Sequence, residues 1–141
     1  MLAKTVFLSY APEERRSELK SILERAGMKV ILGGDTELDH ISEDAKVLLD
    51  KADCSLHILD PFVNQESSIS IAKSQFNLAK KESEIRPGFK IFIWQTGTIT
   101  EQISKSKQAE FINEIRNSVT ANMYYTDVSS MIHLAWATVR T

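Results

Sequence analysis

The sequence predicts an α/β fold, a five-stranded parallel sheet of flavodoxin-like order 2-1-3-4-5 with helices on both faces. First, short apolar runs alternate with segments whose apolar residues recur at helical spacing, in the order β-α-β-α-β-α-β-α-β-α. Second, the third run, Cys54–Leu59, is almost continuously apolar, as a strand covered on both faces tends to be. Because right-handed crossovers place helices on both faces of a parallel sheet, this alternation favours the doubly wound arrangement.

The first half of the chain supplies two strands and two helices. The opening run is rich in β-formers, and Pro12 with the acids after it favours a helix that begins at once. Gly27 ends that helix, and Gly33 ends the strand that follows. A second, shorter helix is indicated by apolar residues three and four apart. The elements expected are strand Thr5–Tyr10, helix Glu13–Ala26, strand Lys29–Leu32 and helix Ser42–Ala52.

The second half continues the alternation. Asp60 and Pro61 end the third strand, and Ser68 or Ser70 is expected to cap a helix whose apolar residues share one face. A Pro-Gly turn precedes the strand pattern KIFIW, which is the strongest in the chain. The elements expected are strand Cys54–Leu59, a helix ending at Lys81, strand Lys90–Trp94, a helix marked by Phe111 to Val119, edge strand Asn122–Tyr125 and helix Ser129–Val139.

Composition narrows the classes of function. The 141 residues have 43% hydrophobic and 26% charged content, which fits one domain over residues 1–141, either complete or excised from a longer chain. A net charge of −2 lacks the basic field that attracts nucleic acid. The single cysteine, Cys54, fits a reducing cytoplasm, and no apolar run approaches the roughly 20 residues that span a membrane. We therefore expect a cytoplasmic protein with neither a nucleic-acid partner nor a membrane anchor.

A ligand crevice is expected beyond the carboxyl ends of the strands, where the first and third strands diverge. Ser9 and Tyr10 follow the first strand, Gly33 follows the second, and Asp60 and Phe62 follow the third. These five residues are the predicted binding residues. Ordinary loop chemistry is the competing interpretation, since paired glycines more often serve a turn than a ligand.

A phosphoacceptor receiver domain shares this architecture. Asp60 and Thr96 stand roughly where a receiver has its phosphorylated aspartate and its Thr or Ser. A receiver also needs an acidic pair after the first strand to hold Mg²⁺, and Ser9 and Tyr10 occupy that place. The lysine expected after the fifth strand is replaced by Tyr125-Thr126. The sequence therefore argues against a receiver.

Four segments carry a resemblance to a known family. They are Val6-Phe7-Leu8-Ser9-Tyr10 before an acidic helix start, Ala52-Asp53-Cys54 leading into Leu56-His57-Ile58-Leu59-Asp60, Ser70 with Gln75-Phe76-Asn77-Leu78-Ala79, and Ile91-Phe92-Ile93-Trp94. At these places the chain resembles TIR domains of a bacterial, anti-phage type. The resemblance covers about Lys4–Gly97, and beyond it only the order of elements matches.

This resemblance implies a domain that assembles with other TIR domains or cleaves NAD⁺ to release nicotinamide. Active members carry a glutamate on the helix after the third strand, near the oxocarbenium-like ribose. Counting back from Ala79 places that glutamate at Gln75, and counting from Ser70 places it at Lys73. Neither residue is acidic. Glu66 and Glu82 are the weak candidates for a relocated carboxylate, with Gln75 as a third weak candidate for a catalytic role.

Two functions from different classes follow. The first is a signalling domain that self-associates, or contacts another TIR or fused domain, requires no cofactor and has weak or absent NAD⁺ cleavage. Its alternative is an NAD⁺ nucleosidase or cyclase with NAD⁺ as substrate; a deoxyribosyltransferase-like enzyme is more distant and needs a glutamate on the same stretch. The expected contact surfaces are the loop Gly33–Ile41 and the helix Ser70–Lys81, and the residues expected in them are Gly34, Asp35, Asp39, Lys73 and Gln75.

The remaining reactive side chains are assigned to structure. His57 lies inside a central strand and is expected to be a buried, hydrogen-bonded histidine, and Cys54 is expected to pack in the core. Trp94 and Trp136 are expected to pack there too, because neither stands in a basic stretch. Surface positions are expected for the other two histidines, His40 and His133, which have no partner at metal-ligand spacing.

Overall fold

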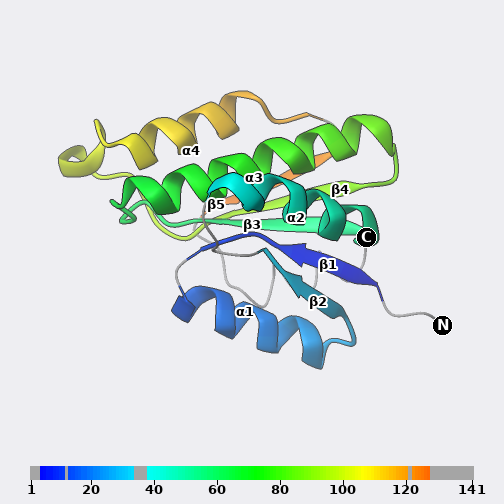
Figure 1. Cartoon of the computed structure of the whole chain (residues 1–141). Helices are drawn as coiled ribbons and strands as arrows, with labels where there is room; N and C mark the ends of the chain where they lie inside the picture. Colours follow the sequence, from blue (N-terminus) through cyan, green and yellow to red (C-terminus); the bar gives the residue numbers. More distant parts are fainter. Residues whose placement is uncertain (1–3, 12, 34–37, 121, 128–141) are drawn as a thin grey trace.

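A five-stranded parallel sheet of order β2-β1-β3-β4-β5 forms the centre of the molecule. The computed structural model describes residues 4–11, 13–33, 38–120 and 122–127. Figure 1 shows β1 and β3 side by side in the middle of the sheet, the place expected for a topological switch point. The predicted fold class is confirmed. The strands are β1 (Thr5–Leu8), β2 (Lys29–Leu32), β3 (Cys54–Leu59), β4 (Lys90–Gln95) and β5 (Met123–Asp127).

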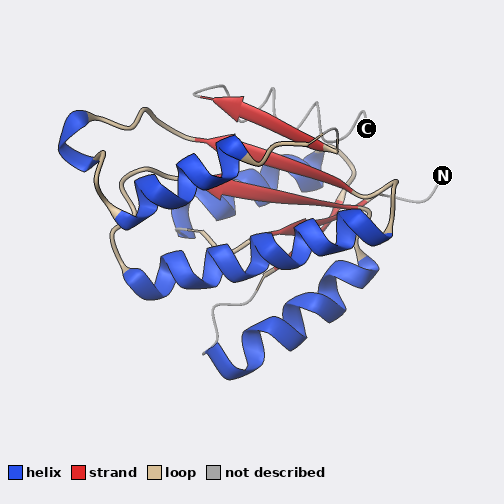
Figure 2. Ribbon diagram, turned by 90° about the horizontal axis from the view of Figure 1, so that it is seen from above, coloured by secondary structure: helices blue, strands red, loops and turns tan. Residues whose placement is uncertain are grey.

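Helices cover both faces of the sheet. Helix α1 (Glu13–Arg25) packs on one face, and α2 (Leu38–Lys51), α3 (Glu66–Ile85) and α4 (Lys107–Asn117) lie on the other (Figures 1 and 2). Side chains of alternate strand residues belong to two apolar clusters, which lie between the sheet and the helices on each of its faces. Strand β3 is buried along its whole length, which accounts for its nearly continuous apolar sequence.

Helix α3 is longer than the sequence predicts, and its start is a correction. Gln65 is the N-cap residue, so neither Ser68 nor Ser70 caps the helix. Glu66 occupies the first turn, where a negative charge interacts favourably with the helix dipole. The helix also runs beyond Lys81 to Ile85, because Glu82 and Ser83 of its last turn are buried and hydrogen-bonded, Glu82 to Arg86 and Ser83 to the carbonyl oxygen of Lys80.

Other boundaries move by a few residues. Strand β1 ends at Leu8, because the backbone N–H of Tyr10 donates a hydrogen bond to the side chain of Gln75 in α3. Helix α2 begins at Leu38, four residues before the predicted Ser42. Helix α4 begins at Lys107, where Ser106 Oγ accepts a hydrogen bond from Ala109 N at 3.1 Å. A single 3₁₀ turn, Glu101–Ile103, was not predicted, and the helix expected at 129–139 lies outside the described residues.

None of the helices in the described part of the chain combines the length and the apolar character that crossing a bilayer requires.

Candidate functional site

A hollow of about 340 Å³ opens at the carboxyl ends of β1 and β3, at the predicted switch point. It brings together three of the predicted binding residues from two different loops, together with the first turns of α3 and α4. Its volume is at the lower end of the range of about 300–1,000 Å³ that is usual for small-molecule sites. The residues that line it include Tyr10, Asp60, Phe62, Gln65, Ser68 and Gln108.

Gln75 of α3 connects the two remaining predicted residues, Ser9 and Gly33, to this edge of the sheet. Its side chain is completely buried, and its Oε1 accepts hydrogen bonds from Ser9 Oγ at 2.9 Å and from Tyr10 N at 2.7 Å. A Cβ atom placed on Gly33 would lie 2.4 Å from the same Oε1. Glycine is therefore required at position 33 by the close approach of the amide. Gln75 is fixed against the ends of both β1 and β2.

The two positions that the motif counts offered for the family's glutamate differ in environment. Gln75 lies against the strand ends, whereas Lys73 is exposed and forms an ion pair with Glu114 of α4 at 3.3 Å. Gln75 is thus the position that the fold places against the strand ends, behind Ser9 and Tyr10, and its side chain is not among those that line the hollow. An amide accepts and donates hydrogen bonds but supplies no negative charge. Its burial also corrects the expectation that Gln75 contributes to a contact surface, because a fully covered side chain cannot touch a partner.

The three carboxylates among the predicted site residues lie in different places. Asp60 lines the hollow, where its Oδ1 accepts a hydrogen bond from Phe62 N at 2.9 Å. Glu66 is exposed at the start of α3 and forms an ion pair with Lys107 of α4. Glu82 lies near the opposite end of α3, about 24 Å along the helix from Glu66 at 1.5 Å per residue. The structure therefore brings only Asp60 into the hollow.

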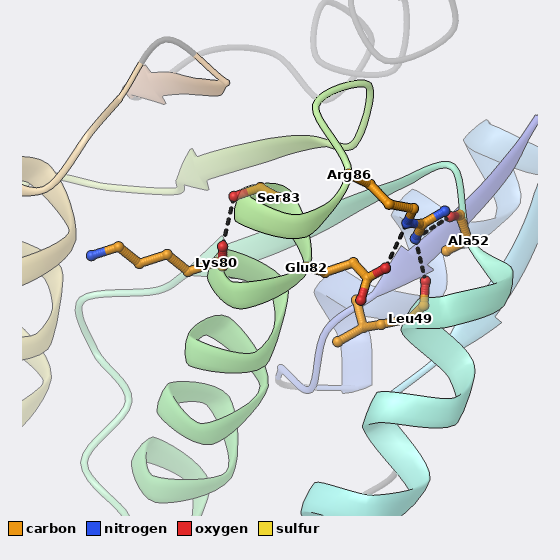
Figure 3. Close-up of polar contacts among 6 residues, drawn as sticks. All are labelled: Leu49, Ala52, Lys80, Glu82, Ser83 and Arg86. Atoms are coloured by element: carbon orange, nitrogen blue, oxygen red, sulfur yellow. Dashed lines mark hydrogen bonds and ion pairs between the residues drawn. The ribbon is translucent and has the colours of Figure 1, made fainter.

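Glu82 is engaged at the amino edge of the sheet. Arg86 Nε donates to Glu82 Oε1 at 2.5 Å, and the same guanidinium donates to the carbonyl oxygens of Leu49 and Ala52 at 2.8 and 3.0 Å (Figure 3). These two carbonyls lie at the end of α2, where the last carbonyl oxygens of a helix have no partner within it. A cation placed there donates hydrogen bonds to them and interacts favourably with the helix dipole. Glu82 serves this contact between α2 and α3.

Gln108, on α4, is a lining residue that sequence reasoning missed. Its side chain is 3% exposed, and Nε2 donates to the carbonyl oxygen of Asp60 at 2.9 Å. Its Oε1 has no hydrogen-bond partner among the described residues. The sequence carries no signal for this residue, because a glutamine in the first turn of a helix is typical of a solvent-facing position.

Arg16 of α1 places a positive charge beside the crevice. Its guanidinium donates to the carbonyl oxygen of Gly33 at 2.7 Å and lies 5.6 Å from the centre of the Tyr10 ring. The contact with the ring is a cation–π interaction. Arg16 thus links α1 to the loops after β1 and β2 and holds the aromatic ring of the predicted binding residue.

His57, Cys54 and Trp94 are confirmed as core residues. Burial lowers the pKa of His57 to about 3, and its Nε2 lies 2.9 Å from Ser55 Oγ. Desolvation likewise raises the pKa of Cys54 to about 12, which leaves the thiol protonated and unreactive. Trp94 is 4% exposed. The expectations for Gly34, Asp35, His133 and Trp136, and for the side chains of Asp39 and His40, lie outside the described residues.

Within the described residues, no group of three His, Cys, Asp or Glu side chains is arranged to hold a metal ion. The place of a receiver's acidic pair is occupied by Ser9, which is bonded to Gln75, and by Tyr10.

Comparisons with known proteins support the fold. No protein-family model matches the chain, and no curated protein matches its sequence. Among solved structures, the chain is similar to a TIR domain in the RPS4 and RRS1 heterodimer, with a TM-score of 0.62 and 14% identity over 99% of this chain and 94% of that one. It is also similar to a response regulator from Thermotoga maritima, with a TM-score of 0.52 and 18% identity over 99% and 97% of the two chains. The chain therefore has the flavodoxin-like fold that TIR domains and response regulators share.

Proposed function

We propose that this chain is a TIR-like signalling domain of bacterial immunity, which acts in the cytoplasm by associating with a second TIR domain and has weak or absent NAD⁺ cleavage. The observation that carries the proposal is Gln75, a neutral amide at the crevice position where the family resemblance places a glutamate. The TIR structure that resembles this chain is described as a heterodimer, which supports association as the mode of action.

The chemistry of the crevice argues against efficient cleavage. Breaking the N-glycosidic bond develops positive charge on the ribose, which a nearby carboxylate stabilises. Gln75 offers no charge, and its oxygen already accepts hydrogen bonds from Ser9 and Tyr10. Arg16 adds a positive charge at the same edge, which disfavours a developing cation.

The outward face of α3 is the surface that we assign to association. It includes Lys73, whose ion pair with Glu114 joins side chains that are 48% and 60% exposed. Such exposed pairs contribute little to stability, about 0–1 kcal/mol, so Lys73 can exchange its partner for an acidic residue of another molecule at small cost. Ser70, Asn77 and Lys81 lie on the same face, at helical spacing, and each is exposed.

Light scattering over a concentration series tests the association. We expect the apparent mass to rise with concentration, and Lys81→Glu to shift the midpoint at least severalfold because it reverses a charge on the proposed surface. Lys46→Glu, on the exposed side of α2, is the matched control and should leave the midpoint unchanged. A chain that stays monomeric at every concentration, alone and mixed with its native partner region, contradicts the proposal.

The alternative is an NAD⁺ nucleosidase or cyclase with a relocated carboxylate, and the hollow beside Asp60 is the observation in its favour. Glu66 would have to leave its ion pair with Lys107 to enter the hollow. Nicotinamide release that is lost in Asp60→Asn or in Glu66→Ala would support this alternative and identify its carboxylate.

A further inference from the structure

A second hollow, of about 360 Å³, lies at the amino edge of the sheet, where β1, β3 and β4 begin. This amino-edge hollow is at the opposite edge of the sheet from the candidate site, and the proposed function makes no use of it. Three basic side chains from separate segments line it, Lys4 before β1, Arg86 after α3 and Lys90 at the start of β4. A chain whose net charge is −2 thus gathers positive charge in one hollow.

Arg86 is held in place by bonds that leave one of its nitrogens out. The bonds to Glu82 and to the carbonyl oxygens of Leu49 and Ala52 engage Nε and Nη2, so the two N–H groups of Nη1 take no part in them (Figure 3). The guanidinium carbon lies 4.9 Å from the centre of the Phe89 ring, which supports its flat face. A guanidinium fixed in this way can donate to an oxyanion without first losing side-chain freedom.

Neither lysine of the amino-edge hollow forms an ion pair with a carboxylate in the described part of the chain. Lys90 Nζ donates a hydrogen bond to Tyr124 Oη at 3.1 Å. An ammonium group has three N–H donors, so two donors of Lys90 remain after this bond. The lysines therefore add both positive charge and hydrogen-bond donors to those of Arg86.

The floor of the amino-edge hollow is apolar. Cys54, Phe89 and Phe92 are buried there, so the cations act beside a region of low dielectric, where charges interact more strongly than in water. Burial is the main reason why the pKa of Cys54 is raised, while the ammonium of Lys4 lowers that pKa and the carboxylate of Asp53 raises it. The charges of Lys4 and Asp53 therefore both lie close to this floor.

Asp53 lines the same hollow, and its charge opposes an anion. Its Oδ2 accepts a hydrogen bond from Thr5 N at 2.7 Å, and its own N–H donates to Thr5 O at 2.8 Å, so Asp53 secures the start of β1. When Asp53 and the Glu82 partner of Arg86 are set against the three cations, an excess of positive charge is left. A bound anion would balance this excess.

We propose that the amino-edge hollow binds a small oxyanion, a carboxylate or phosphate group that accepts hydrogen bonds from Arg86 Nη1 and is neutralised by Lys4 and Lys90. The volume of the hollow is within the range usual for small-molecule sites, which leaves room for an organic group attached to the oxyanion. This inference goes beyond the proposed function and does not rest on it, because binding at the amino edge requires neither association nor NAD⁺ cleavage.

Amide-detected NMR titration of the whole chain tests the proposal, with inorganic phosphate and acetate as separate probes. Sodium chloride at the same ionic strength is the matched control, because it screens surface charge but offers no oxygen acceptor. We expect saturable shifts at the backbone amides of Cys54, Phe89 and Lys90, and at the Nε–H of Arg86, that chloride does not reproduce. Saturation with one probe alone identifies whether the planar or the tetrahedral group fits.

Charge-neutral variants locate the binding. Lys4→Gln and Lys90→Gln, at half-buried positions, should each weaken binding of the saturating probe severalfold, because each removes one cation from the hollow. Lys29→Gln is the matched control and should bind as the wild type does. Lys29 is exposed at the same edge of the sheet, at the start of β2, but does not line the hollow.

Asp53→Asn tests the proposal with the opposite sign. The amide keeps an oxygen to accept from Thr5 N but removes a negative charge from the hollow, so we expect severalfold tighter binding. A variant that only disturbed the fold would weaken binding instead. No saturable shift at millimolar probe, equal shifts with chloride, an equal loss in Lys29→Gln, or no tightening in Asp53→Asn overturns the proposal.

Discussion

Helix α3 buries a charged group near its carboxyl-terminal end and a neutral amide at its middle. At the amino edge of the sheet a carboxylate, Glu82, is buried beside a cation, and Arg86 ties it to the carbonyl oxygens at the end of α2 (Figure 3). At the carboxyl edge a neutral amide, Gln75, is buried among backbone and hydroxyl donors. The amide oxygen of Gln108, nearby, has no partner among the described residues.

This difference concerns what each buried group requires of its surroundings. A buried carboxylate needs a partner charge, and Arg86 supplies it together with bonds that join two helices. A buried amide needs no counter-charge, so Gln75 adds no negative charge at the carboxyl edge. The charges of Asp60 and Arg16 lie beside the hollow at that edge, whereas the Glu82–Arg86 pair at the amino edge joins two helices.

The largest expected effect is on the amino edge. Arg86→Ala removes the partner of a Glu82 side chain that is only 11% exposed and frees two carbonyls at the end of α2. We expect the free energy of unfolding to fall by about 3 kcal/mol, the usual cost of breaking a largely buried pair. Urea denaturation measures it. Lys20→Ala, which breaks an exposed pair with Glu24, should cost less than about 1 kcal/mol, and equal losses would refute the comparison.

The next effect lies at the carboxyl edge. Gly33→Ala places a Cβ atom 2.4 Å from Gln75 Oε1 and 2.9 Å from Phe7 Cζ, so the amide or the strand end must move. We expect a loss of about 2 kcal/mol, as for other overpacked sites, measured by thermal unfolding. Gly88→Ala is the control, because nothing lies within 4 Å of a Cβ atom there. A neutral Gly33→Ala would show that Gln75 is not fixed against the strand.

A smaller effect is expected at His57 of β3, where the free energy of unfolding should change with pH. The folded protein keeps this imidazole neutral down to a pKa of about 3, whereas the unfolded chain takes up a proton near the usual 6.5. Protonation of the unfolded chain therefore lowers the free energy of unfolding as the pH falls below 6.5, by about 1.4 kcal/mol per pH unit.

Urea titrations at pH 7, 6 and 5 measure this dependence in the wild type and in His57→Leu. Other acidic groups contribute to both proteins, so the difference between their slopes isolates His57. We expect the variant to lose stability less steeply on acidification. Parallel curves would mean that the histidine is not held neutral in the folded protein.

The strands and their order were predictable because each carries its own apolar run and its own turn residues. The ends of α3 were not, because Glu82 and the neighbouring Ser83 are polar in sequence yet buried in the fold. The switch-point rule placed Tyr10, Asp60 and Phe62 together, since it depends only on strand order. It is silent on residues contributed by helices, which is why Gln108 was missed.

Motif counting could not decide between Lys73 and Gln75. Positions two residues apart on a helix point in directions that differ by about 200°. One of these two side chains therefore faces the sheet and the other faces solvent, and only the packing of the helix shows which. The buried hydrogen bonds of Gln75 to Ser9 and Tyr10 settle its place, whereas Lys73 pairs on the surface.

Nicotinamide release from NAD⁺, compared between the wild-type chain and Gln75→Glu, tests whether the amide at position 75 limits cleavage. Glutamate is nearly isosteric with glutamine, and the donors of Ser9 and Tyr10 remain to receive a carboxylate. Our expectation is weak or no release by the wild type, and faster release by the variant. Wild-type turnover that Gln75→Glu leaves unchanged would contradict it, because the amide at position 75 would then not be what limits the crevice.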